Sequence, residues 1–147
     1  MRRTRLFLIF ALWLLPLGVA LAAEAETPAG HWFLEGEERG IHFQAIYDRT
    51  PNGKFVVTIR TVKGCQIDRQ WEETGTWVFK GGLLINHTET VAGERVQGVK
   101  EELNDKFRVT VIDRDHQEWL DLETKIPWHP RRVPQGFKFP VSSDCAA

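Results

Sequence analysis

Histidines are the side chains of this sequence most able to bind a metal ion or move a proton near neutral pH. A zinc or copper site needs three or four convergent ligands, which closely spaced His and Cys residues often reveal. The chain has no H-x-H pattern, no H-E-x-x-H pattern and no cysteine beside a histidine. The five histidines fall in five predicted segments: His31, His42, His87, His116 and His129. His31 and His42 could meet across neighbouring strands, but the spacing predicts no metal site and no cofactor.

Carboxylates and nucleophiles offer little further chemistry. Glutamates form adjacent pairs at positions 72–73 and 101–102. Adjacent side chains of a strand point to opposite faces, so neither pair forms a close acid–base dyad by itself. The only serines are Ser142 and Ser143, and there is no G-x-S-x-G nucleophile motif. We therefore expect that the protein is not an enzyme.

One glutamate could face the interior of the fold, and the sequence leaves this question open. Glu73 shares the alternation of Trp71 and Trp77 along the same segment. An unpaired buried charge is costly, so an interior carboxylate needs a partner, which Arg60 or Arg108 could supply. Perturbed interior groups often mark functional sites, and this is the hypothesis for Glu73.

Tryptophans are numerous for a domain of this size. Outside the leader there are five: Trp32, Trp71, Trp77, Trp119 and Trp128. Large aromatic side chains either fill the core of a small barrel or line an apolar pocket. If a cavity exists, the residues we expect in its wall are Phe43, Phe55, Trp71 and Trp77.

The two cysteines predict a disulfide. Cys65 and Cys145 are the only cysteines. Residues 1–23, with a basic start followed by an apolar run, predict an exported protein, and an exported protein meets oxidising conditions. The bond would close a loop of about 80 residues and contribute roughly 4 kcal/mol by the loop-entropy model. There is no C-x-x-C pattern, so nothing favours a reactive thiol.

The elements that must position these side chains are short strands. From Gly30 onward apolar residues recur with a period of two, and no window shows a helical stripe. Turn signals at Asn52-Gly53, Gly81-Gly82, Ala92-Gly93, Asn104-Asp105 and Arg114–His116 separate the predicted strands. After the first strand, these are residues 41–48, 54–62, 71–79, 83–91, 95–103, 107–112 and 117–125.

This rhythm predicts an all-β fold, a small antiparallel up-and-down barrel of eight or nine strands. Closure removes the unpaired edges that an open meander would leave, and every connection is short. We expect a polar lead-in at 24–29, the barrel domain at 30–125 and a proline-rich tail at 126–147.

The tail differs in composition from the barrel domain. Pro127, Pro130, Pro134 and Pro140 disfavour both a helix and a central strand. The segment also carries three aromatic side chains. We therefore expect it to wrap the outside of the barrel or cover one end, tied back by Cys145.

The N-terminus has the order of a secretory signal peptide. Basic residues precede the apolar run of residues 6–15, and Ala20-Leu21-Ala22 supplies the small residues of a cleavage site. We therefore assign residues 1–23 as the signal peptide and expect no membrane span after its removal. The expected location is periplasmic or secreted.

Several phrases of the sequence resemble the lipocalins and their calycin relatives. Gly30-His31-Trp32 resembles the G-x-W of that group, and a late cysteine that could bridge to an earlier strand is also similar. Gly75-Thr76-Trp77, followed by a Gly-Gly hairpin and Leu83-Leu84-Ile85, resembles lipocalin-like bacterial exported proteins. The resemblance implies a barrel with an internal cavity and an apolar ligand. It also implies that Arg131 or Arg132 packs over the early tryptophan.

The net charge of the chain reduces the number of function classes to consider. Without the three leader arginines, 16 basic residues remain against 20 acidic ones, which argues against nucleic acid as a partner. We expect an exported, non-enzymatic protein that binds a small apolar or amphipathic ligand. The alternative is a periplasmic protein-interaction module, such as an inhibitor of an envelope enzyme, docking through its tail. A ligand carrier needs a cavity of roughly 300 Å³ or more, whereas an interaction module needs an exposed apolar patch.

Overall fold

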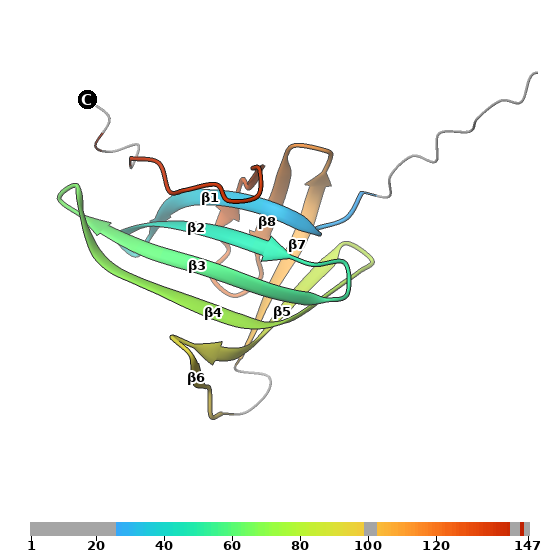
Figure 1. Ribbon diagram of the computed structural model, residues 1–147. Helices are drawn as coiled ribbons and strands as arrows, with labels where there is room; N and C mark the ends of the chain where they lie inside the picture. The colour runs from blue at the N-terminus through green and yellow to red at the C-terminus, as the bar shows by residue number, and fades with distance from the viewer. Residues whose placement is uncertain (1–25, 99–102, 142–144, 146–147) are drawn as a thin grey trace, which may run out of the picture.

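The structure is a computed structural model that describes residues 26–98, 103–141 and 145. The predicted signal peptide, residues 1–23, lies outside this described part of the chain. Almost all regular structure in the described residues is β-strand (Figure 1). No helix among these residues is long and apolar enough to cross a membrane.

The described residues form ten strands, and three of these strands are only two residues long. In chain order they are β1 (Gly30–Glu38), β2 (Ile41–Arg49), β3 (Lys54–Lys63), β4 (Gln66–Lys80), β5 (Leu83–Val91), β6 (Glu94–Arg95), β7 (Asn104–Ile112), β8 (Gln117–Asp121), β9 (Pro127–Trp128) and β10 (Arg131–Arg132).

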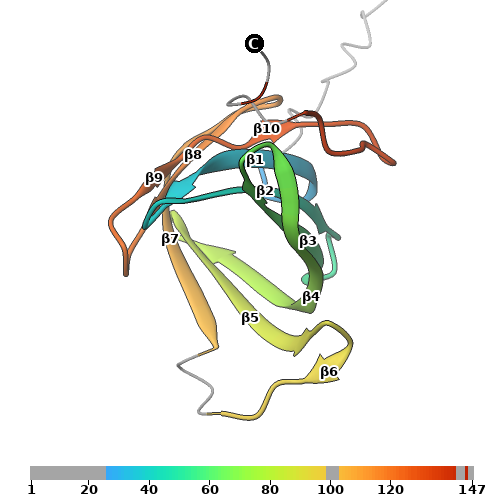
Figure 2. The ribbon, with the colours of Figure 1, turned by 90° about the vertical axis from the view of Figure 1, so that its left-hand side faces the viewer.

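The strands form one antiparallel sheet that curls on itself. Its order is β10-β1-β2-β3-β4-β5-β7-β8-β9, and β6 pairs with the end of β5. The two ends of this order meet, because β9 pairs with β8 while β10, a few residues later in the same segment, pairs with β1. Figure 2 shows the resulting half-open barrel, with β7 spreading away from β3 and β4. The predicted all-β antiparallel barrel is confirmed at this level.

Two predicted hairpin turns have the backbone that their glycines allow. Gly53, between β2 and β3, has a φ of 82°. Gly81 and Gly82, between β4 and β5, have φ values of 59° and 74°. Consecutive residues with positive φ are characteristic of a type I′ turn, which matches the twist of paired strands.

The prediction of a strand over residues 95–103 is wrong in the part that the structure describes. Strand β6 ends at Arg95, residues 96–98 leave the sheet, and residues 99–102 lie outside the described part. The predicted turn at Asn104-Asp105 is also wrong, because both residues belong to β7. The physical reason is that β6 and β7 share one edge of β5: β6 pairs with its end, and β7 pairs with residues 83–87.

The tail also departs from expectation, because part of it is a strand within the sheet. Residues 127–133 lie between β8 and β1 and bond to both. Proline cannot donate a hydrogen bond, but it can accept one. The amide of Gln117 donates to the carbonyl of Pro130, and the amide of Val133 donates to the carbonyl of His31. The segment therefore completes the sheet despite its prolines.

The core is built mainly from aromatic side chains, which come from strands all around the sheet. Four of the five tryptophans in the described residues are buried: Trp32, Trp77, Trp119 and Trp128. The Trp119 ring packs edge-on against Tyr47 with 5.7 Å between ring centroids, and Trp128 packs against Phe43 at 5.0 Å. Most tryptophans therefore fill the interior, and Trp71 alone among these five remains half-buried.

The outer face of β1, β2 and β3 carries a row of polar side chains. Glu35 Oε1 lies 3.0 Å from His42 Nε2 and accepts a hydrogen bond from Gln44 Nε2 at 2.7 Å. Arg60 Nε donates to Gln44 Oε1 at 2.7 Å, and its Nη2 donates to the carbonyl of Pro140. Gln44 is fully buried although it faces outward, and Arg60, which donates to it, also contacts Pro140 and Phe139 of the tail.

Aromatic contacts and the disulfide hold the tail on this outer face. The rings of Phe33 and Phe137 lie 5.5 Å apart, and the Arg60 guanidinium lies 4.6 Å from the centre of the Phe139 ring. Cys65 and Cys145 are bonded, which confirms the predicted disulfide. A disulfide indicates an oxidising, extracytoplasmic environment.

Candidate functional site

The register of the sheet defines which side chains face the interior. Residues directly opposite on antiparallel strands share a face. Tyr47 pairs with Val57, Val57 with Glu73, and Glu73 with Val91. Val57 and Tyr47 are buried in the core, so this row points inward. Glu73 is therefore interior, as its alternation predicts.

The partners predicted for Glu73 do not face it. Arg60 is engaged on the outer face, and Arg108 is exposed on the opposite alternation of β7 from buried Phe107. Glu73 instead accepts a hydrogen bond from Trp71 Nε1 at 2.8 Å. This bond holds the Trp71 ring against the inner face of β4.

A cavity of about 960 Å³ opens at the end of the barrel where the β1–β2 and β3–β4 turns lie. Its apolar lining comes from Ile41, Val62, Trp71 and Val91. Lys63, Asp68 and Arg69 add charge at its rim. The volume is at the upper end of the range of small-molecule pockets. A concave, mostly apolar surface with a few charged groups is the arrangement that binds small amphipathic molecules. We refer to it below as the mouth cavity.

The four residues predicted as a ligand wall separate into two groups. Trp71 lines the mouth cavity. Phe55 and Trp77 belong to the buried core, where Trp77 Nε1 donates to the carbonyls of Thr50 and Lys54 at 3.1 Å. Phe43 is partly buried and packs against that core. Alternation places all four on the inner face, but it does not separate the open end from the filled end.

A buried arginine is the interior group that the sequence analysis missed. Arg49 is 1% exposed, and its guanidinium lies 4.2 Å from the ring centre of Tyr47 and 4.7 Å from that of Trp119. Its Nη2 donates to Asn86 Oδ1 at 3.4 Å. The sequence pattern could have placed Arg49 on the inner face, because Arg49 continues the alternation of Ala45 and Tyr47.

Hydrogen-bond donors outnumber acceptors around this arginine. Within the described residues, four buried nitrogens have no hydrogen-bond partner: Nε and Nη1 of Arg49, Nδ2 of Asn86 and Nε2 of Gln117. An unsatisfied buried donor costs roughly 1–3 kcal/mol. Stacking between two aromatic faces offsets part of the cost of burying the cation. Burial lowers the pKa of Arg49 to about 10, while Tyr47 and Asp105 act in the opposite direction.

Carboxylates on the other side of the barrel complete the interior charge pattern. Asp105 pairs with Asn86 across β5 and β7. Its side chain reaches solvent, yet the surrounding protein and the nearby carboxylates of Glu73, Asp121 and Glu123 raise its pKa to about 6, and Arg49 partly opposes this shift. Asp105 was assigned to a turn by the sequence, which is why this group was not foreseen.

Substituting Asp105 should change how stability depends on pH. The folded protein holds the Asp105 proton up to about pH 6, whereas the ordinary value is 3.8. The folded state therefore binds more protons in this window, and the stability associated with this proton is lost as pH rises through 6. We expect Asp105→Asn to increase the free energy of unfolding at pH 7.5 by about 1 kcal/mol, after allowing for solvent screening.

Urea denaturation at pH 5 and pH 7.5 measures this effect, because the gain from Asp105→Asn should shrink at the lower pH. Asp68→Asn is the matched control, since Asp68 is exposed and is expected to change stability little at either pH. An equal effect of Asp105→Asn at both values would contradict the explanation.

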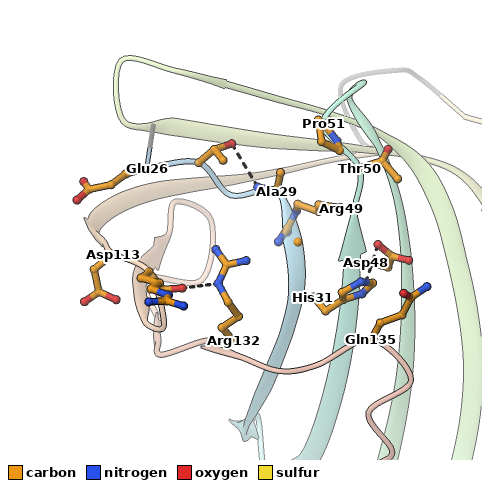
Figure 3. Close-up of a pocket in the computed structure, with 13 residues that line it drawn as sticks. Glu26, Ala29, His31, Asp48, Arg49, Thr50, Pro51, Asp113, Arg132 and Gln135 are labelled. Carbon is orange, nitrogen blue, oxygen red and sulfur yellow. Dashed lines mark hydrogen bonds and ion pairs between the residues drawn. The ribbon is translucent and has the colours of Figure 1, made fainter. Parts of the chain in front are cut away.

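A second cavity of about 730 Å³ lies at the opposite end of β1, and most of the residues that line it are polar or charged. Figure 3 shows His31 facing Asp48, with His31 Nδ1 3.5 Å from Asp48 Oδ1. Arg132 in the same view donates to the carbonyl of Arg114. Charged side chains make up much of its lining, whereas apolar side chains line the mouth cavity, so we consider the mouth cavity the better site for a small amphipathic molecule.

The histidines are not arranged as the sequence suggested. His31 pairs with Asp48 and His42 with Glu37, at opposite ends of the β1–β2 ladder, so the suggested meeting of the two histidines is wrong. Three other side chains do converge on the outer surface: His116, Glu118 and His129. Closure of the sheet brings β8 beside the tail segment and so creates this cluster.

Comparison with known proteins adds no identification. No protein-family model matches the chain, and no curated protein matches it.

Proposed function

We propose that this protein is an exported, non-enzymatic binding protein that holds a small amphipathic ligand in the mouth cavity. The observation that carries the proposal is the cavity of about 960 Å³ with Trp71 in its wall. It exceeds the roughly 300 Å³ that a small-molecule carrier needs. The disulfide and the predicted signal peptide support a periplasmic or secreted location.

The charges around the cavity favour one orientation of the ligand. The rim carries two positive charges, on Lys63 and Arg69, and one negative charge, on Asp68. The interior beyond Trp71 is acidic, because Glu73 lies on the next inward position of β4. An anionic headgroup is therefore favoured at the rim and disfavoured deeper inside. The apolar part of the ligand packs against Trp71 and its apolar neighbours.

The lipocalin-like reading gains support from one contact. The Arg132 guanidinium lies 4.3 Å from the ring centre of Trp32, the tryptophan of the Gly30-His31-Trp32 phrase. Of the two arginines suggested for this role, Arg132 is the one that lies over Trp32, whereas Arg131 lies over Phe33. Within the described residues the chain departs from lipocalins after the barrel, where a proline-rich segment replaces their helix.

The protein-interaction alternative draws less support. It requires a tail free to dock on a partner, but Phe137 and Phe139 pack on the outer face of this same chain. The disulfide also ties the end of the tail to the β3–β4 turn. A ligand carrier uses the mouth cavity without disturbing these contacts.

Two fluorescent probes with related ring systems test the proposal. Anilinonaphthalene sulfonate is anionic and phenylnaphthylamine is uncharged. We expect both to bind saturably and to quench Trp71 by energy transfer. Trp71→Ala should weaken both probes about five- to thirtyfold, since loss of an aromatic wall costs about 1–2 kcal/mol. Val78→Ala, on the exposed outer alternation of β4, is the control and should leave both affinities unchanged.

Charge reversal at the rim tests the orientation of the ligand separately from its binding in the mouth cavity. Lys63→Glu combined with Arg69→Glu should weaken the anionic probe about tenfold, through roughly 1.4 kcal/mol of lost attraction, and leave the uncharged probe unchanged. Equal weakening of both probes would refute the orientation of the ligand. Absence of saturable binding by either probe would refute the function.

A further inference from the structure

The seam that closes the barrel carries a cluster of metal-ligating side chains on its outer surface. His116 immediately precedes β8 and Glu118 lies within it, while His129 lies between β9 and β10. The outward direction follows from alternation, because Gln117 and Trp119 between and beside them are buried. The cluster is therefore on the opposite side of the sheet from the interior and from the mouth cavity.

The geometry brings one donor atom from each side chain into a small volume. Donor atoms of His116, Glu118 and His129 all lie within 4.8 Å of one another. His116 Nε2 is 4.0 Å from Glu118 Oε1, and the two imidazole rings are stacked with 6.5 Å between centroids. Tetrahedral ligands at about 2.0–2.2 Å from zinc lie roughly 3.3 Å apart. Side-chain movements of about 1 Å, on a partly exposed surface, would complete the arrangement.

A further carboxylate is placed to orient His116. Asp113 Oδ2 lies 3.8 Å from His116 Nδ1, the ring nitrogen that does not face Glu118. Metal-bound histidines usually direct their second nitrogen to a carboxylate or carbonyl, which fixes the tautomer. Asp113 Oδ1 accepts backbone hydrogen bonds from Asp115 and His116 at 2.9 and 2.7 Å. These bonds fix the Asp113 carboxylate beside His116.

We propose that His116, Glu118 and His129 form a binding site for a divalent transition metal ion of the zinc type, with Asp113 orienting His116. Two imidazoles and one carboxylate are a donor set that zinc accepts, with water completing the coordination. Calcium and magnesium prefer oxygen donors and are not expected to compete.

The site would tie the tail to the body of the barrel. Glu118 belongs to β8, whereas His129 belongs to the segment that joins β8 to β1. A metal ion held by both would fix the closing segment in place. Because such an ion binds the folded chain in preference to the unfolded chain, it raises apparent stability, and the increase grows with the logarithm of the free ion concentration once that concentration exceeds the dissociation constant.

Zinc binding by the protein purified without a polyhistidine tag tests the site directly. Calorimetric titration with zinc chloride in excess magnesium should show one ion bound per chain. His129→Ala and His116→Ala should each weaken binding at least tenfold. His31→Ala is the matched control, because His31 lies in the polar cavity beside Asp48 and should leave zinc affinity unchanged.

Thermal unfolding gives a second readout that a merely structural histidine would not move. Zinc should raise the melting temperature of the wild type and of His31→Ala, but not that of His129→Ala. His129 is exposed, so its replacement is not expected to prevent folding. No measurable binding by the wild type, or undiminished binding by both seam variants, would overturn the proposal.

Discussion

Replacing both cysteines with serine is expected to lower the free energy of unfolding by about 4 kcal/mol. The Cys65–Cys145 bond spans 80 residues of sequence, so it removes a large part of the conformational freedom of the unfolded chain. A loss of this size is a large fraction of the stability of an ordinary small domain.

Loss of the disulfide should also affect the tail, because the bond anchors the end of the tail to the barrel. The tail that it anchors accepts a hydrogen bond from Arg60 through the carbonyl of Pro140, and the Phe139 ring of the tail lies against the Arg60 guanidinium. Once the anchor is gone, ordering the tail requires the full loss of its conformational entropy. We therefore expect the tail to become sensitive to proteases before the barrel does.

Urea denaturation of the oxidised wild type, the reduced wild type and the Cys65→Ser/Cys145→Ser variant measures the effect. The reduced protein and the double variant should agree. Val141→Ala is a suitable control, since that tail residue is 72% exposed and contributes little packing. A decrease of less than about 1 kcal/mol would mean that the tail is held by its packing alone, which the entropic account excludes.

Local patterns were sufficient to predict most of the sheet. Alternating apolar residues and the glycine pairs at the turns are local signals, and the hairpins at Gly53 and at Gly81-Gly82 depend on little else. The errors occur where pairing is decided by distant segments. Asn104 and Asp105 have turn-forming side chains, but pairing with Asn86 and His87 places them in β7.

For the candidate sites, too, local patterns predicted part of the arrangement and contacts between distant segments decided the rest. Alternation was enough to place Glu73 and Trp71 on the inner face. It could not show that Trp71 lines a cavity whereas Phe55 is packed in the core, because that depends on how the sheet opens at one end. The histidine cluster at the seam was not predictable, since a proline-rich segment was not expected to enter the sheet. Only that entry brings His129 to His116.

Replacing Trp32 with alanine is expected to destabilise the fold by about 3–5 kcal/mol, the range observed for truncating a buried tryptophan. Trp32 has no exposed surface, and its Nε1 donates to the carbonyl of Pro28 at 2.9 Å. It pairs with Tyr47 on one side and with Arg132 on the other, so the same ring supports both strands that flank β1. The Arg132 guanidinium lies over it as well.

A graded series separates these contributions. Trp32→Phe keeps an aromatic face for Arg132 but removes the hydrogen bond to Pro28 and part of the volume, so it should cost about 1–2 kcal/mol. Arg132→Ala should cost about 1 kcal/mol, as expected for a partly exposed cation over an aromatic ring.

Trp71→Ala is the control that connects this prediction with the proposed function. Trp71 is half-buried at the mouth cavity, so its removal should affect probe binding far more than stability. Trp32→Ala should do the reverse under conditions where that variant remains folded, because Trp32 is remote from the cavity lining. If Trp71→Ala were as destabilising as Trp32→Ala, the ring would be a structural part of a filled barrel. The division of the interior into a packed end and a binding end would then be wrong.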